Sequence, residues 1–198
     1  MLTPARAVLL TGLLLLGTVN AVLASTASAD TTPLQFLGFR AGARLTEVEA
    51  QLRRLGGSTM RCRRSKIDPR VAECRAALNV PELGVPVDLW VSAIDSTAGV
   101  IMLSGVMASD QLESWRQVLQ HRYGQVGARV QGTQWMLQWV RRGRMLRLTW
   151  RLEKAGKNAS VSLVDGRVLD DWARSRSPSP AARSPMVARD SQLVSRTR

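Results

Sequence analysis

Residues 134–152 read QWMLQWVRRGRMLRLTWRL, and this stretch decides the fold class of the chain. Apolar and polar residues alternate on both sides of Arg142-Gly143, which is the pattern of two β-strands joined by a two-residue turn. Such a turn pairs residue 139 with 146, 137 with 148 and 135 with 150. The leucines then share one face of the hairpin, so the sequence predicts an antiparallel sheet with one buried and one solvated face.

The tryptophans of this hairpin follow the same alternation. Trp135, Trp139 and Trp150 fall on the leucine-rich face, and we interpret them as core residues rather than as a ligand-binding cluster. Trp90 alternates instead with Asp88 and Ser92 in another predicted strand. It therefore lies either on the outer face of the sheet or beneath a covering element.

Short turns connect the other predicted strands. Residues 87–93 alternate, residues 95–99 form a turn, residues 100–106 form the partner strand, and residues 159–164 form a later strand. A strand is also expected just before the first helix. Parallel strands cannot be joined by turns this short, so all pairing should be antiparallel.

Two helices interrupt the strands. The first follows Gly42 and ends at Gly56-Gly57, and Thr46 with Glu49 forms its predicted capping box. The second starts near Ser109 and ends at Gly124. Their apolar faces carry Leu45, Val48, Leu52 and Leu55 in the first helix and Leu112, Trp115, Leu119 and Tyr123 in the second. The predicted fold class is α+β, with two helices packed on one face of an antiparallel sheet; an alternative divides it into two helix-plus-meander halves.

Both ends of the chain differ in composition from the middle. Residues 1–29 combine Arg6, an apolar run and a small-residue site at Ala27-Ser28-Ala29, which indicates a cleavable signal peptide; retention as an anchor is the alternative. Residues 174–198 are rich in Ser, Pro and Arg, and we expect them to be disordered. A single domain should occupy residues 30–173 of a protein that is exported, either periplasmic or secreted.

The two cysteines fit an exported protein. Cys62 and Cys74 fall opposite each other if a hairpin centres on Asp68, and an oxidising compartment favours a disulfide between them. Their Cα atoms should then lie about 4.4–6.8 Å apart. The alternative places residues 71–78 on a helix.

The net charge of +13 is carried mainly by arginine. Two clusters stand at predicted hairpin ends. The first contains Arg61, Arg63, Arg64 and Lys66 with Arg70 and Arg75, and the second contains Arg141, Arg142 and Arg144 with Arg147 and Arg151. These residues are candidate anion-binding groups, although ordinary solvated charge is the simpler interpretation. The partners that such a surface attracts include an anionic polymer, such as acidic polysaccharide or nucleic acid, or an acidic lipid surface.

One segment resembles a known group of proteins. Residues 36–48 read FLGFRAGARLTEV, with Leu52 and Gly56 following. This segment resembles the opening of small envelope proteins of the outer-membrane-assembly small-lipoprotein and beta-lactamase-inhibitor-protein type. The resemblance implies helices followed by antiparallel strands, and a role in binding other proteins. The chain departs from the first type because it has no cysteine for lipid attachment.

Catalytic and metal-binding patterns were sought among the remaining residues. His121 is the only histidine, no carboxylate pair stands out, and the sequence has neither a nucleophile elbow nor a phosphate-binding glycine loop. We therefore expect no catalytic, cofactor-binding or metal site. The favoured function is a non-enzymatic binding or accessory domain with a protein partner in the cell envelope; the alternatives are a polyanion-binding protein and an enzyme of unrecognised type.

Overall fold

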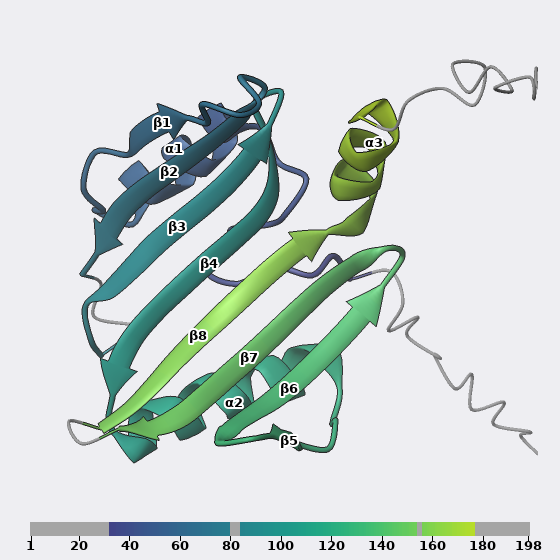
Figure 1. Ribbon diagram of the computed structural model, residues 1–198. Helices are drawn as coiled ribbons and strands as arrows, with labels where there is room; N and C mark the ends of the chain where they lie inside the picture. The colour runs from purple at the N-terminus through teal and green to yellow at the C-terminus, as the bar shows by residue number, and fades with distance from the viewer. Residues whose placement is uncertain (1–31, 80–83, 154–155, 177–198) are drawn as a thin grey trace, which may run out of the picture.

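The computed structural model describes residues 32–79, 84–153 and 156–176 (Figure 1). The predicted signal peptide and residues 177–198 of the predicted tail lie outside these ranges. Within them the chain forms three helices and eight strands, in the order α1 (Leu45–Arg54), β1 (Arg61–Arg64), β2 (Val71–Leu78), β3 (Val87–Ile94), β4 (Thr97–Met107), α2 (Ser109–Tyr123), β5 (Arg129–Gln131), β6 (Gln134–Arg141), β7 (Arg144–Glu153), β8 (Gly156–Asp165) and α3 (Gly166–Arg176).

All eight strands belong to one antiparallel sheet, in the order β1-β2-β3-β4-β8-β7-β6-β5. Strands β1 to β4 form one meander and β5 to β8 form another, and each meander follows a helix in the sequence. The two meanders join where β4 pairs with β8, for example at Ile101 opposite Leu163. The centre of the sheet is therefore built from residues about sixty positions apart in the chain.

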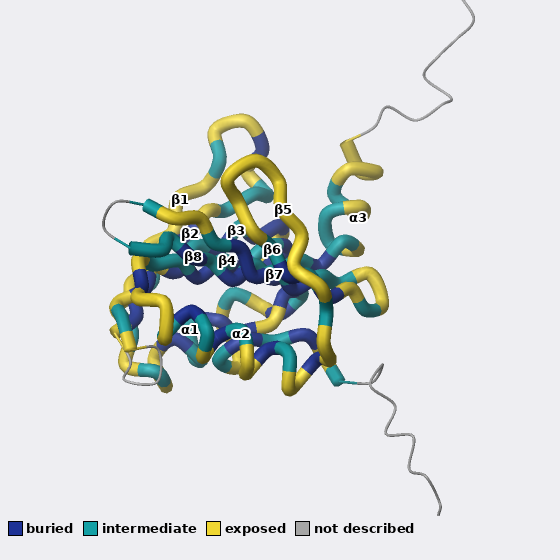
Figure 2. Tube along the Cα trace, turned by 90° about the horizontal axis from the view of Figure 1, so that it is seen from below, coloured by how far each residue is buried: buried dark blue, intermediate teal, exposed yellow. Residues whose placement is uncertain are grey.

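Helices α1 and α2 lie on the same face of the sheet (Figure 2). Val48 and Leu52 of α1 are buried, as are all four apolar residues predicted for α2: Leu112, Trp115, Leu119 and Tyr123. They pack on sheet residues that alternate at every second position, including Leu89, Leu103, Leu148 and Val161. Burial of these leucine and valine side chains supplies the main stabilisation of the fold, at about 1.5–3 kcal/mol each.

The predicted fold class needs correction. The described residues are 47% strand and 26% helix, so the molecule is mostly sheet, and it contains a third helix that the prediction of two helices omitted. Helix α3 has no buried residue, so its sequence lacks the continuous apolar stripe by which an amphipathic helix is predicted. Edge strands β1 and β5 also bury no side chain, and β5 was missed for the same reason.

The start of α1 differs from the expected capping box. The helix begins at Leu45 after Arg44, and the backbone N–H of Arg44 donates to Oε1 of Glu47 at 3.4 Å. Glu47 therefore takes the role assigned to Glu49. The strand expected before this helix is also absent: residues 36–39 form a tight turn with reciprocal Phe36–Phe39 backbone bonds and positive φ at Leu37 and Gly38. Both phenylalanines are buried, so the turn fastens this segment to the core.

The structure confirms the three predicted hairpins, including that of β3 with β4, where Leu89 lies opposite Leu103. Strands β6 and β7 pair Leu137 with Leu148 and Trp139 with Leu146, as expected. Trp139 is buried, but Trp135 is 46% exposed because it lies towards the short edge strand β5. Strands β1 and β2 pair Cys62 with Cys74 in a disulfide, so the helical alternative for residues 71–78 is wrong. The Cα atoms lie 3.9 Å apart, which is below the expected range of about 4.4–6.8 Å.

The C-terminal boundary also shifts. Helix α3 runs to Arg176, three residues past the predicted domain end at 173, so residues 174–176 are helical. No helix among the described residues is long and apolar enough to span a membrane. The disulfide is compatible with an exported protein.

Candidate binding site on the open sheet face

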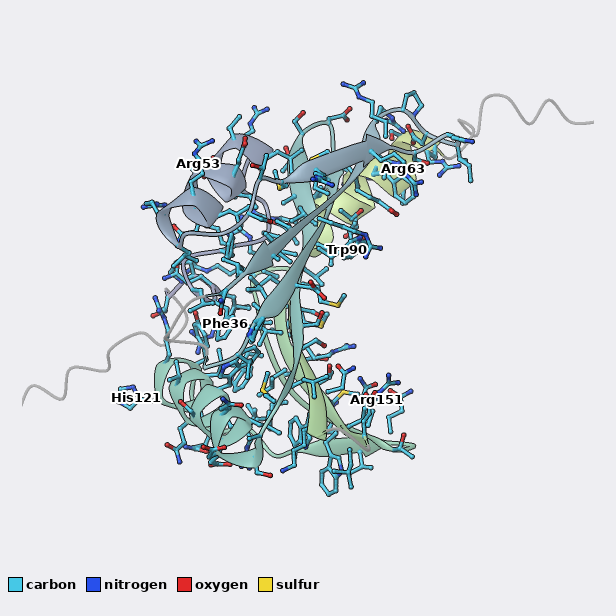
Figure 3. The ribbon with its side chains drawn as sticks, turned by 90° about the vertical axis from the view of Figure 1, so that its left-hand side faces the viewer. Phe36, Arg53, Arg63, Trp90, His121 and Arg151 are labelled. Carbon is cyan, nitrogen blue, oxygen red and sulfur yellow. A yellow bond between two sulfur atoms is a disulfide. The ribbon has the colours of Figure 1, made fainter. Side chains whose placement is uncertain are left out.

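The side of the sheet opposite α1 and α2 is here called the open face. Figure 3 shows the sheet as an arc, with Arg63, Trp90 and Arg151 on this side and with Arg53 and His121 on the helix side. The outer strands curve towards the open side, and the face is therefore concave (Figures 2 and 3). The strand register places one straight row of open-face side chains across seven strands: Arg61, Arg75, Trp90, Met102, Ser162, Arg147 and Gln138.

Strand alternation explains why these residues point away from the core. On β3, Leu89 and Val91 are buried under the helices, so Trp90 between them faces the other way. On β4, the same holds for Met102 between Ile101 and Leu103. The structure thus resolves the position of Trp90 in favour of the outer face, where it is half-buried.

A hollow of about 800 Å³ lies at the β1 end of the open face. Its charged lining consists of three arginines, Arg61, Arg63 and Arg75, and two carboxylates, Glu73 and Asp88. A neighbouring hollow of about 340 Å³ shares Arg75 and Asp88 and continues over Trp90, Met102 and Ser104. The two hollows share lining residues and are together called the β1–β4 groove below; Trp90 and Met102 line the end away from β1.

The three arginines of the β1–β4 groove have no ion-pair partner in the part of the chain that the structure describes. Arg61 lies directly opposite Arg75 in the β1–β2 ladder, and like charges in that position repel. Arg63 lies opposite Glu73, yet among the described residues none of the three arginines has a carboxylate oxygen within 4.0 Å of a guanidinium nitrogen. All three side chains are exposed and available to an external anion.

The half of the open face formed by β6 and β7 is different, because its arginines have hydrogen-bond partners within the protein. Arg147 donates from Nε and Nη2 to Oε1 of Gln138 at 3.0 and 2.8 Å. Arg151 donates from Nε to Oε1 of Glu153 at 2.7 Å. The predicted second cluster therefore contributes two open-face residues whose hydrogen-bonding groups are already engaged.

The remaining predicted anion-binding residues do not reach the open face. Arg64 alternates to the helix side of β1 with Cys62. Arg141 donates from Nη2 to the carbonyl of Tyr123 at 2.8 Å and so holds the C-terminal end of α2. Arg142 occupies the β6–β7 turn with a φ of 48°. Arg144 belongs to an ion cluster around a buried carboxylate.

That carboxylate is Asp165, at the junction of β8 and α3. Its Oδ2 accepts from Nε of Arg144 at 2.7 Å and from Nη2 of Arg167 at 3.2 Å, and its Oδ1 accepts from the backbone N–H of Arg167 at 3.1 Å. Burial alone would raise the pKa of Asp165, but the hydrogen bonds and charges of Arg167 and Arg144 outweigh it and hold the pKa below the ordinary value of 3.8. This cluster has a structural role.

Helix α3 stands at one end of the open face, on the side of the sheet away from α1 and α2 (Figures 1 and 2). Nε1 of Trp172 donates to Oδ2 of Asp68 at 2.9 Å, and Nη1 of Arg70 donates to Oγ of Ser175 at 2.9 Å. The Arg70 guanidinium, joined by the Trp172 indole N–H, holds the pKa of Asp68 well below its usual range. These contacts fasten α3 to the β1–β2 turn.

Sequence reasoning found part of this site and missed the rest. Arg61, Arg63 and Arg75 belong to the first predicted basic cluster, whereas Met102 was assigned no binding role. Strand alternation explains the side on which Arg75 lies, since a residue next to the bridged Cys74 must face the opposite side of β2. His121 is exposed on α2, as expected for a surface residue. The chain was compared with protein-family models, with curated proteins and with solved structures, and none of the three comparisons finds a match.

Proposed function

We propose that this chain is a non-enzymatic binding domain that holds a protein partner on the open face of its sheet. The observation that carries the proposal is the concave face that α1 and α2 leave open, with Trp90 and Met102 half-buried beside arginines that have no ion-pair partner among the described residues. Covering such a face removes apolar surface from water, while the arginines supply directional bonds at its margin. Export places the partner in the cell envelope or outside the cell.

The composition of the face favours a protein partner over a polyanion. Tryptophan, methionine and arginine are enriched at protein interfaces. Glu73 and Asp88 line the same groove as the arginines and would repel a densely charged polymer. The resemblance of residues 36–48 to envelope proteins that bind other proteins points in the same direction.

Site-specific photo-crosslinking tests the proposal. A photoreactive amino acid replaces Met102 on the open face or, as the matched control, exposed Val118 on α2. Each protein is irradiated in envelope extract of the source cells. We expect a discrete protein adduct from position 102 that is lost in the Trp90→Ser background, and no such adduct from position 118. Equal labelling from both positions, or none from position 102, would overturn the proposal.

Polymer binding is measured with the same proteins. Retention on a heparin column that falls steeply with salt, combined with no adduct from position 102, would replace the protein partner with a polyanion.

A further inference from the structure

We propose that the β1–β4 groove is an anchor for an acidic polypeptide segment. Arg61, Arg63 and Arg75 bind carboxylates of the segment, and Trp90 with Met102 receives an apolar side chain beside them. This inference rests on the proposed function and names the chemistry of the partner: an exposed segment in which Asp or Glu stands close to a large apolar residue.

The arrangement of charge is the first argument. Side chains directly opposite in an antiparallel pair have Cβ atoms about 4.5–5.5 Å apart, so the guanidinium groups of Arg61 and Arg75 share one region of solvent. In the described part of the chain neither is paired with a carboxylate. A carboxylate placed between them would relieve their repulsion and accept hydrogen bonds from both. An arginine side chain is well suited to this role because its planar fork matches a carboxylate.

The contrast with neighbouring arginines is the second argument. Arg144 and Arg147 have hydrogen-bond partners on adjacent strands, and Arg151 has one two residues further along its own strand. On these strands the partners of the arginines are Asp, Gln and Glu side chains. Glu73 stands directly opposite Arg63, and the two still form no ion pair within 4.0 Å in the described structure. The guanidinium groups on β1 and β2 remain available to a ligand.

The spacing of the row sets the form of the ligand. Adjacent strands lie about 4.8 Å apart, so the backbone of Trp90 is about 5 Å from that of Arg75 and about 10 Å from that of Arg61. Side chains two positions apart on an extended peptide lie on one side at about 6.8 Å. An extended segment crossing the strands can therefore place a carboxylate at the arginines and an apolar side chain over Trp90.

The carboxylates in the groove select a peptide among anionic ligands. Asp88 lines both hollows, and Glu73 lines the larger one. Their oxygens can accept hydrogen bonds from the N–H groups of a peptide. The same two charges disfavour a ligand with uniformly high negative charge density.

Selection from a random peptide library tests the anchor without requiring the natural partner. Random dodecapeptides displayed on phage are panned against the full mature chain, its Arg61→Gln/Arg75→Gln variant and a control, Arg53→Gln/Arg54→Gln. The control removes the same number of charges from exposed positions at the end of α1, on the helix side of the sheet. We expect wild type and control to enrich peptides with Asp or Glu near a large apolar residue, and the groove variant to lose this enrichment.

Affinity is then measured by fluorescence anisotropy with a selected peptide and with its Asn/Gln counterpart. We expect about tenfold or greater weakening from either the groove variant or the neutral peptide, equal to the loss of one charge-assisted bond. Unchanged near-ultraviolet circular dichroism shows that each variant is folded. Selected peptides without acidic residues, or equal affinity for wild type and the groove variant, would overturn the anchor.

The results separate this inference from the proposed function. If position 102 still yields its protein adduct in the Arg61→Gln/Arg75→Gln background with undiminished intensity, the open face binds a protein but the acidic anchor is wrong. If neither the adduct nor selected peptides are obtained, both proposals fail. Binding of heparin with no selected peptide would overturn the polypeptide ligand.

Discussion

Removal of the Cys62–Cys74 bridge should cost about 3 kcal/mol of unfolding free energy. The perturbation is the double variant Cys62→Ala/Cys74→Ala, compared with wild-type protein kept oxidised. The bridge spans twelve positions in sequence, and closing a loop of this size restricts the unfolded chain by about 3 kcal/mol. Cys74 is fully buried, so its shortened side chain adds a small packing loss; Cys62 is exposed and adds none.

The local effect should be confined to β1. All four residues of this edge strand are exposed, and besides the bridge only its ladder with β2 was found to hold it in the described structure. Strands β6 and β7 lie on the other side of the β4–β8 centre of the sheet and do not depend on the bridge. Because Arg61 and Arg63 flank Cys62, loosening of β1 should also weaken a ligand held in the β1–β4 groove.

Urea denaturation followed by tryptophan fluorescence measures the global loss. With a slope of about 2 kcal/mol per molar urea, a loss of 3 kcal/mol lowers the midpoint by about 1.5 M. Native-state hydrogen exchange separates the local loss from the global one: exchange in β1 should accelerate more than exchange in β6 and β7, whose slowest amides should follow only the global loss. A midpoint shift below about 0.5 M, or an acceleration in β1 no greater than that in β6 and β7, would refute the reasoning.

Three further predictions concern the contacts around α3. Asp165→Asn should lower the free energy of unfolding by about 2–3 kcal/mol, since Arg144 and Arg167 lose a buried charged acceptor. The folded pKa of Asp165 lies below 3.8, so its contribution to stability is full well above that pH and is lost as the pH falls through the folded pKa. Urea titrations at pH 7 and pH 3 should show that wild type is more stable than Asp165→Asn by a smaller margin at pH 3. An equal margin at both pH values would contradict the lowered pKa of Asp165. Trp172→Phe keeps an aromatic side chain but removes the donor to Asp68, and hydrogen exchange should speed up in α3 but not in α2. Gly42→Ala should lower the melting temperature by the equivalent of at least about 1–2 kcal/mol, because φ is +83° there and the new Cβ would clash with Oδ2 of Asp165; an unchanged melting temperature would argue against this backbone geometry.

Local pattern in the sequence determined the individual elements. The alternation in residues 134–152 and the turn at Arg142-Gly143 specified the pairing of β6 with β7 residue by residue. The twelve-residue spacing around Asp68 likewise specified Cys62 opposite Cys74. The four buried residues of α2 followed from helical spacing. In each case the information lies within a single helix or hairpin, where the periodicity of the side chains along the backbone shows directly in the sequence.

Only the tertiary structure decided how these elements combine. The β4–β8 pairing joins Val100 with Val164, and no local signal specifies a partner at that separation. Helix α3 is held by Trp172 against Asp68, 104 positions away, and without a buried face it could not be recognised from its own residues. The same long-range pairings sort the arginines: Arg144 meets a buried carboxylate, whereas Arg61 meets another arginine across β1 and β2. Whether a charged side chain is neutralised or left for a ligand depends on its neighbours in space, and the sheet order sets those neighbours.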